Sequence, residues 1–146
     1  MRLRSLIAPT ILALSLAAPV QAQQPNRLIT ILTAPEPQTQ LMAMILTLNA
    51  VIAGAKAEIL LCGPAGDIAL AAAPEAATAG QPPRGASPQA MMKMLMGERG
   101  VRVQVCALYL PSKGSNASIL IEGVTPAAPD AMGASIVAPG VTVMSF

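Results

Sequence analysis

The stretch Leu28-Ile-Thr-Ile-Leu-Thr33 decides the fold, because its β-branched and apolar residues suit a strand that is buried on both faces. A second strand of similar character is predicted over Ala57–Cys62. Between them, Thr39–Ala53 is apolar almost all round and is followed by Gly54, which is typical of a buried helix and its end. Strands that alternate with helices predict an α/β domain with a mainly parallel sheet.

The rest of the chain continues this alternation. Ser87 and Pro88 predict a helix start, with a hydroxyl placed to cap and a proline at the first helical position, and Gly100 ends that helix after Arg99. Residues 65–86 are expected to form a loop with one or two Ala-rich helical turns. A third strand is predicted over 101–106; it continues into 107–111, which also holds the start of its exit loop. After it we expect a short helix over 116–121, a short strand over 123–125, a helix over 129–136 and a closing strand over 141–146. We therefore expect five strands.

The composition removes whole classes of chemistry. The 146 residues leave room for one domain and contain no histidine, no tryptophan and only two aromatic residues, Tyr109 and Phe146. Without histidine, this chain cannot form a serine–histidine or cysteine–histidine pair, a histidine metal site or an imidazole base. Catalysis by this chain would therefore have to use cysteine, lysine, tyrosine or a carboxylate.

Residues 1–22 have the pattern of a secretory signal peptide. Arg2 and Arg4 form a basic start, Leu6–Ala18 is apolar, and Val20-Gln-Ala22 is a small-x-Ala cleavage site. The apolar run is shorter than the roughly 20 residues of a membrane span, so we expect cleavage rather than an uncleaved anchor. The mature domain over 23–146 is then exported, periplasmic and without a membrane partner. Because it carries as many basic as acidic residues and hardly any aromatic ones, nucleic acid is not an expected partner either.

Both cysteines are predicted at the carboxyl edge of the sheet, where the loops of parallel α/β proteins carry their chemistry. Cys62 ends the second strand and Cys106 ends the third, so the two can approach each other if these strands are neighbours. Export makes a disulfide chemically feasible. Three interpretations of Cys106 stay open from the residues alone: a reactive thiol in a loop-lined crevice, half of a disulfide with Cys62, or an inert buried cysteine.

Five segments of the chain carry a family resemblance. They are Leu28–Thr33, Leu60-Leu-Cys-Gly-Pro-Ala-Gly66, Pro88–Pro111 with its run Gly-Val-Arg-Val-Gln-Val-Cys ending at Cys106, Leu120–Pro126 and Pro139–Phe146. Together they resemble the DsrE/DsrF-like family over nearly all of residues 23–146. The resemblance implies a three-layer α/β/α domain of flavodoxin-like architecture with a parallel five-stranded sheet. It also implies oligomers, and we expect a homo-oligomer that is a trimer or a hexamer.

The resemblance also points to one cysteine. In the sulfur-relay members of that family, a cysteine at the end of a central strand carries sulfur as a persulfide, and Cys106 matches it. This implies sulfur-carrier, sulfurtransferase-like or thiol-redox activity, with a sulfur donor and acceptor as partners. Attack on a donor needs a thiolate, which a nearby cation such as Lys113 favours. Cys62 is then a resolving cysteine, a disulfide partner or merely a strand-end cysteine.

A second function from a different class remains open, which is a non-catalytic oligomeric binding or scaffold protein with structural cysteines. Two further side chains are pocket candidates beside Cys106. Tyr109 is interpreted as lining the pocket, donating a hydrogen bond or packing at the rim. Asp67 is a candidate polar pocket group, but we expect it to cap a helix that begins at Ile68.

No cofactor and no metal site is expected. The loop Thr33-Ala-Pro-Glu-Pro-Gln-Thr39 lacks glycine, and its two prolines lack the N–H groups that cradle the phosphate of a flavin or nucleotide. The nine methionines invite a copper hypothesis. Those of the helix over 88–99 are nevertheless expected to serve core packing or subunit contacts; they are Met91, Met92, Met94 and Met96.

Overall fold

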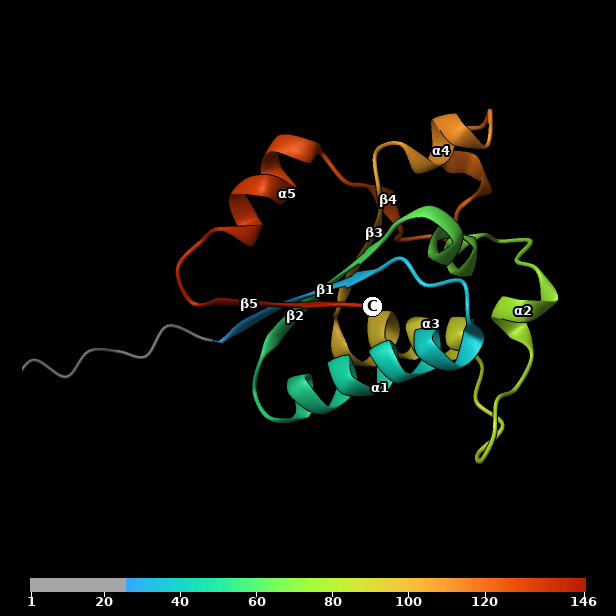
Figure 1. Cartoon of the computed structure of the whole chain (residues 1–146), viewed down its shortest axis with the longest axis horizontal. Helices are drawn as coiled ribbons and strands as arrows, with labels where there is room; N and C mark the ends of the chain where they lie inside the picture. The colour runs from blue at the N-terminus through green and yellow to red at the C-terminus, as the bar shows by residue number, and fades with distance from the viewer. Residues whose placement is uncertain (1–25) are drawn as a thin grey trace, which may run out of the picture.

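The computed structural model describes residues 26–146, and the signal peptide predicted at 1–22 lies outside them. These residues build a five-stranded sheet in the order β4-β3-β2-β1-β5, with every neighbouring pair parallel (Figure 1). The strands are β1 (Arg27–Leu32), β2 (Lys56–Leu61), β3 (Arg102–Val105), β4 (Thr125–Pro126) and β5 (Val141–Ser145). The predicted parallel sheet of five strands is therefore confirmed.

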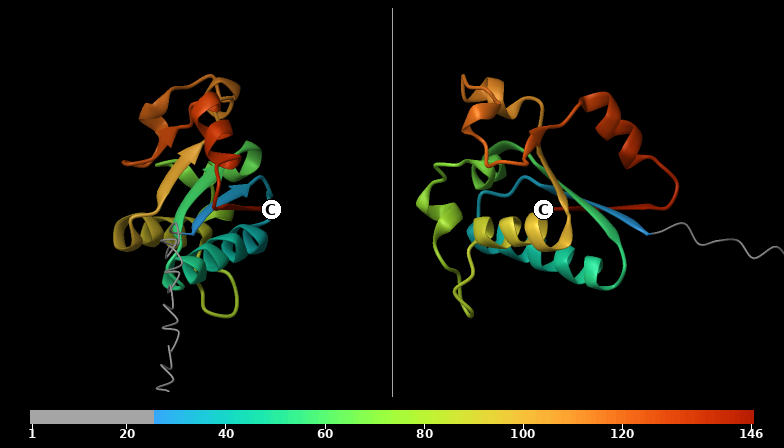
Figure 2. Two further views of the ribbon diagram at one scale, coloured as in Figure 1. Left: turned by 90° about the vertical axis from the view of Figure 1, so that its left-hand side faces the viewer. Right: turned by 180° about the vertical axis from the view of Figure 1, so that it is seen from behind.

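Helices cover both faces of this sheet (Figure 2). The longer ones are α1 (Pro37–Ile52), α3 (Pro88–Arg99) and α5 (Pro129–Ile136). Helices α1 and α3 connect strands that follow one another in one direction, whereas α5 leads back to the far side of β1 and lies on the opposite face. Right-handed crossovers explain this, because reversing the direction along the sheet moves the connecting helix to the other face. In the described part of the chain, no helix combines the length and the apolar content needed to cross a bilayer.

The larger core lies between the sheet and the pair of helices α1 and α3. Alternate residues of each strand point into it. Those that are fully buried with their helix partners include Leu32, Ile59, Leu61, Val103, Val105, Met44, Met92 and Leu95. Thr30 of β1 and Thr47 of α1 are also buried there, and their hydroxyl oxygens lie 2.7 Å apart in a hydrogen bond. This bond satisfies polar groups that the core would otherwise leave unpaired.

The helix ends follow the residue types found there. Helix α3 spans Pro88–Arg99 as predicted: Ser87 Oγ accepts a hydrogen bond from the Ala90 N–H at 3.2 Å, and Gly100 adopts the left-handed conformation with a φ of 63°. Helix α1 begins at Pro37, two residues before the predicted start. Proline fits the first helical position because it gives up an N–H that has no partner inside the helix.

The predicted continuation of the third strand past Cys106 into residues 107–111 is wrong. Strand β3 ends at Val105, and Tyr109–Ser112 form the short helix α4. The edge strand β4 pairs with only Gln104 and Val105, and Pro111 has no N–H to offer a ladder. The chain therefore turns after Cys106, whose carbonyl accepts the Tyr109 N–H at 2.9 Å.

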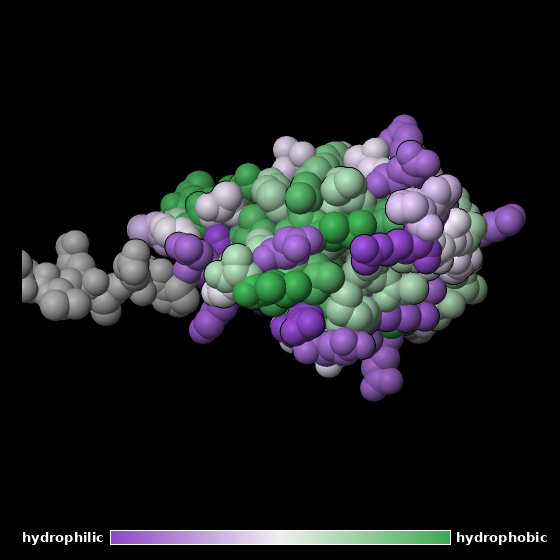
Figure 3. Space-filling view, turned by 90° about the horizontal axis from the view of Figure 1, so that it is seen from below, coloured by the Kyte–Doolittle hydropathy of each residue, from purple (hydrophilic) through white to green (hydrophobic). Residues whose placement is uncertain are grey.

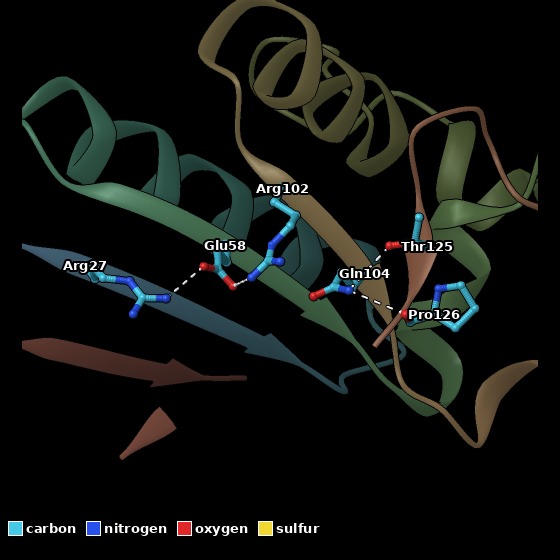
Figure 4. Close-up of polar contacts among 6 residues, drawn as sticks. All are labelled: Arg27, Glu58, Arg102, Gln104, Thr125 and Pro126. Carbon is cyan, nitrogen blue, oxygen red and sulfur yellow. Dashed lines mark hydrogen bonds and ion pairs between the residues drawn. The ribbon is translucent and has the colours of Figure 1, made fainter. Parts of the chain in front are cut away.

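The face under α5 is smaller and more polar. Its buried apolar residues are Ile29, Leu60, Ala127 and Met132. Beside them Glu58 of β2 lies between Arg27 and Arg102, one from each neighbouring strand, with Arg27 Nη2 3.0 Å from Glu58 Oε1 (Figure 4). Burial alone raises the pKa of Glu58, but the hydrogen bonds and charges of Arg102 and Arg27 outweigh it and hold that pKa below its usual value. We call these three residues the Glu58 cluster.

Candidate functional site

Cys62 and Cys106 form a disulfide at the carboxyl edge of the sheet. Each is the first residue after its strand, and β2 and β3 are neighbours with Leu61 opposite Val105. One residue beyond that pair, the Cys106 N–H donates to the Leu61 carbonyl at 2.8 Å, and the two cysteine Cα atoms lie 5.0 Å apart. This separation is within the range that a disulfide requires. The sheet thus joins cysteines that are 44 positions apart in the sequence.

The disulfide is half-buried on the face of the sheet that α5 covers. Both cysteines pack against the small cluster that contains Leu60 and Met132. Of the three interpretations of Cys106, the structure has the one in which it is bonded to Cys62 rather than free. The bond thus lies outside the larger core and is in part exposed to solvent.

Tyr109, Asp67 and Lys113 lie at the same edge and contact one another. The Tyr109 hydroxyl donates to Asp67 Oδ1 at 2.7 Å, and Lys113 Nζ lies 2.7 Å from that oxygen and 5.6 Å from the centre of the Tyr109 ring. Tyr109 is only 3% exposed, and its burial together with the Asp67 carboxylate raises its pKa above the usual value. The phenol therefore stays protonated at neutral pH and acts as a hydrogen-bond donor.

Gly66 sets the position of the Tyr109 ring. It belongs to the 3-10 helix η1 (Gly63–Ala69), which follows Cys62 directly. A Cβ atom at Gly66 would overlap the ring, so any side chain there would displace either Tyr109 or η1. Sequence reasoning missed this role, because Gly63-Pro-Ala-Gly66 signals only a turn. The close approach of backbone and ring is a tertiary contact that no local pattern encodes.

The role predicted for Asp67 at this edge is wrong, and Lys113 has a different partner from the one predicted. Asp67 does not cap a helix that begins at Ile68, because it lies inside η1. Its carboxylate reaches across to Tyr109 and Lys113. Lys113, expected to favour a thiolate at Cys106, has its ammonium group paired with Asp67.

A groove lies on another part of the surface, away from the cysteines. It has a volume of about 640 Å³ and lies between α1, the start of α3 and the turn over residues 81–86, and none of the five predicted site residues lines it. Its walls are mostly apolar; they include Leu41, Met42, Ile45, Leu48, Pro82, Pro83 and Met91, with Arg84 at the rim. This groove is therefore not the crevice that the sequence predicts beside Cys106.

Three of the four methionines of α3 pack in or against the larger core. Met92 is fully buried, and Met91 and Met96 pack against the larger core. Their flexible thioethers fill space between the helices and the sheet. Within residues 26–146, no three histidine, cysteine or acidic side chains gather as metal ligands do.

Comparisons with known proteins find likeness in structure and not in sequence. No protein-family model and no curated protein sequence matches the chain. The chain is similar to the ychN protein of E. coli, with a TM-score of 0.64 and 16% sequence identity over 83% of this chain and 99% of that one. It is also similar to MTH1491 of Methanobacterium thermoautotrophicum, described as a protein of unknown function, with a TM-score of 0.60 and 14% identity over 82% of this chain and 98% of the other.

These likenesses place the fold. Both structures have the DsrE/DsrF-like fold, and each is covered almost from end to end. The protein is thus an α/β protein with a DsrE-like arrangement of a parallel sheet between helical layers, and it has a disulfide at the carboxyl edge of that sheet.

Proposed function

We propose that this protein handles sulfur through Cys62 and Cys106, which alternate between a dithiol and a disulfide, with Cys106 carrying sulfur as a persulfide. The observation that carries the proposal is the half-buried disulfide between two neighbouring strand ends. The carboxyl edge of a parallel sheet is where such folds place their chemistry. The DsrE-like fold supports the persulfide step, because Cys106 matches the sulfur-carrying cysteine of the relay members.

The two cysteines suffice for a balanced cycle. The Cys106 thiolate attacks the terminal sulfur of a persulfide donor, takes that sulfur as Cys106–S–SH and releases the donor thiolate. The Cys62 thiolate then attacks the inner sulfur of Cys106, expels hydrosulfide and forms the Cys62–Cys106 disulfide. The cysteine pair gives up two electrons, and the transferred sulfur is reduced to sulfide. A dithiol reductant restores both thiols, so the disulfide is the discharged state of this cycle.

Export to the periplasm belongs to the same proposal. The predicted signal peptide at 1–22 and the disulfide both suit an oxidising compartment. Detection of the mature chain, cut after Ala22, in a periplasmic extract is the expected result. Retention of residues 1–22 on a cytoplasmic chain would contradict this part of the proposal.

The persulfide step is tested on the reduced mature chain with glutathione persulfide as donor and intact mass as readout. The Cys62→Ser variant keeps the carrier but cannot expel sulfide, so it should accumulate a reducible gain of one sulfur atom. The Cys106→Ser variant is the matched control and should gain none, whereas the unmodified chain should release sulfide and form its disulfide. Equal loading of both variants, or of neither, would overturn the assignment of Cys106.

A second candidate function, a non-catalytic oligomeric scaffold, is favoured by the surface of α1. None of its 16 residues is charged, and Met42 and Ile52 are 50% and 63% exposed. The face that carries α1 and α3 has hydrophobic side chains gathered among hydrophilic ones (Figure 3). Such a helix suits contact with another subunit.

The scaffold function makes opposite predictions about the cysteines. If it holds, light scattering gives a trimer or hexamer, and glutathione leaves the disulfide closed until the chain is unfolded. A homo-oligomer is compatible with both functions, so the state of the disulfide decides between them. A monomer at micromolar concentration would contradict the expected self-association.

A further inference from the structure

The segments that follow the two cysteines are held together by side chains in addition to the disulfide. Segment η1 follows Cys62, and α4 (Tyr109–Ser112) follows Cys106. Past the bond between Cys106 and Leu61, no backbone hydrogen bond joins η1 to α4 in the described chain. Asp67 links the two through side chains: it binds the Tyr109 hydroxyl and the Lys113 ammonium, with the Tyr109 ring seated on Gly66. We call these four residues the Tyr109 brace. Farther along, the Ile121 N–H donates to the Ala69 carbonyl and the Ala71 N–H to the Ile119 carbonyl, so a backbone bridge joins the end of η1 to the residues after α4.

The contacts of the brace do not involve either sulfur atom. Its hydrogen bond, ion pair and ring contact can therefore form whether the cysteines are bonded or free. The bond between Tyr109 and Asp67 is charge-assisted and connects a side chain that is 3% exposed with one that is 31% exposed. In the reduced protein, the brace therefore still acts together with the backbone bonds and the core packing that hold the residues after Cys62 beside those after Cys106.

We propose that the Tyr109 brace positions the two thiols after the disulfide opens and thereby sets the equilibrium between dithiol and disulfide. This inference rests on the proposed function, in which the disulfide opens and closes. Oxidation of the dithiol by glutathione disulfide yields the protein disulfide and two glutathione molecules, so two electrons pass from the cysteines to glutathione. Its equilibrium constant is proportional to the effective concentration of one thiol near the other.

The brace acts on this constant through the reduced state. In the oxidised protein, the disulfide holds η1 and α4 together even when the brace is cut. In the reduced protein, cutting the brace loosens η1 against α4, which lowers the fraction of molecules in which the two thiols are placed to form the bond. The disulfide and the brace therefore stabilise each other by one and the same factor, as linkage requires.

The test measures this equilibrium constant in glutathione buffers, with acid quench, alkylation and intact mass as readout. Tyr109→Phe keeps the ring on Gly66 and removes the hydroxyl, whereas Asp67→Asn removes the carboxylate. Each should lower the constant by up to about tenfold, the lower end of what one hydrogen bond to a charged group contributes. Glu58→Gln is the matched control: it removes a carboxylate from between two cations on the sheet face, and it should leave the constant unchanged.

The outcomes separate this inference from the function beneath it. If the unmodified chain shows no dithiol–disulfide equilibrium while folded, the proposed function fails. If it does, and Tyr109→Phe and Asp67→Asn match Glu58→Gln, the brace has no positioning role and only the inference fails. Far-ultraviolet circular dichroism of each reduced variant identifies any that does not fold, and the other variant then decides.

Discussion

Asp67 and Glu58 are each held by two partners, yet the two carboxylates hold different things together. Glu58 lies on the sheet, and its partners Arg27 and Arg102 belong to strands that the ladder already joins to β2. Asp67 lies beyond the sheet and joins η1 to residues of and after α4, where the nearby backbone link is an isolated bridge between Leu70 and Leu120 and not a strand ladder. The effect of a polar contact on the structure therefore depends on which other contacts hold together the two segments that it joins.

The largest effect is expected at the edge where Asp67 lies, on reduction of the disulfide. Opening a closed loop of 44 residues frees chain entropy in the unfolded state, which lowers the free energy of unfolding by about 4 kcal/mol. Urea unfolding with and without reductant measures this difference. The Cys62→Ser/Cys106→Ser double variant should match the reduced chain and show no further response to reductant. A difference below about 1 kcal/mol would show that the unfolded chain is already constrained there.

A substitution at Gly66 tests the contact between η1 and the Tyr109 ring within the brace. Gly66→Ala should lower the free energy of unfolding by about 1–3 kcal/mol, because the added Cβ overlaps the Tyr109 ring and the packed neighbours must shift. Gly97→Ala is the matched control on α3, where an added Cβ meets no atom within 4 Å. It should raise stability by about 0.5–1 kcal/mol, because alanine suits a helix interior better than glycine. Equal effects of the two variants would mean that the ring does not rest on η1.

The fold could be predicted further than the site could. Local signals predict strand β1 and helix α3. The strand is predicted by the β-branched apolar run Leu28–Thr33, and the helix by the cap, the proline and the terminal glycine of Ser87–Gly100. The strand order is not local, so the sequence left open whether β2 and β3 are neighbours. The error at residues 107–111 has the same origin, because an apolar run forms a strand only where another strand is available to pair with it.

At the site, residue type identified the participants but not their contacts. The sequence predicts five site residues, and all five lie at the carboxyl edge of the sheet: Cys62, Cys106, Asp67, Tyr109 and Lys113. That Asp67 faces Tyr109 instead of capping a helix depends on the docking of η1 against α4. Gly66 carries no functional group, so only the three-dimensional overlap reveals why a side chain is not tolerated there.

A smaller effect is expected in the Glu58 cluster, and it depends on pH. Because the pKa of Glu58 is lower in the folded chain than its ordinary value of 4.5, its contribution to stability is present above that value and is lost as the pH falls through the folded pKa. Glu58→Gln should cost about 1 kcal/mol at pH 7. The difference between the two chains, measured by urea unfolding from pH 7 to pH 3, should shrink below pH 4.5. A difference that stays constant with pH would mean that Glu58 contributes through packing and not through charge.

The smallest effect on stability is expected from the two exposed cations, one in the Glu58 cluster and one in the Tyr109 brace. Arg102 and Lys113 each pair with a carboxylate and have side chains that are 55% and 42% exposed. Solvent screens both ion pairs, so Arg102→Gln and Lys113→Gln should each cost no more than about 0.5 kcal/mol, and high salt should remove most of it. Stability alone therefore does not distinguish them. The glutathione equilibrium does: Lys113→Gln weakens the brace and should lower the constant, whereas Arg102→Gln leaves the strand ladder intact and should not. If both variants shift the constant equally, the cysteine pair responds to the stability of the whole fold and the distinction between sheet and edge is lost.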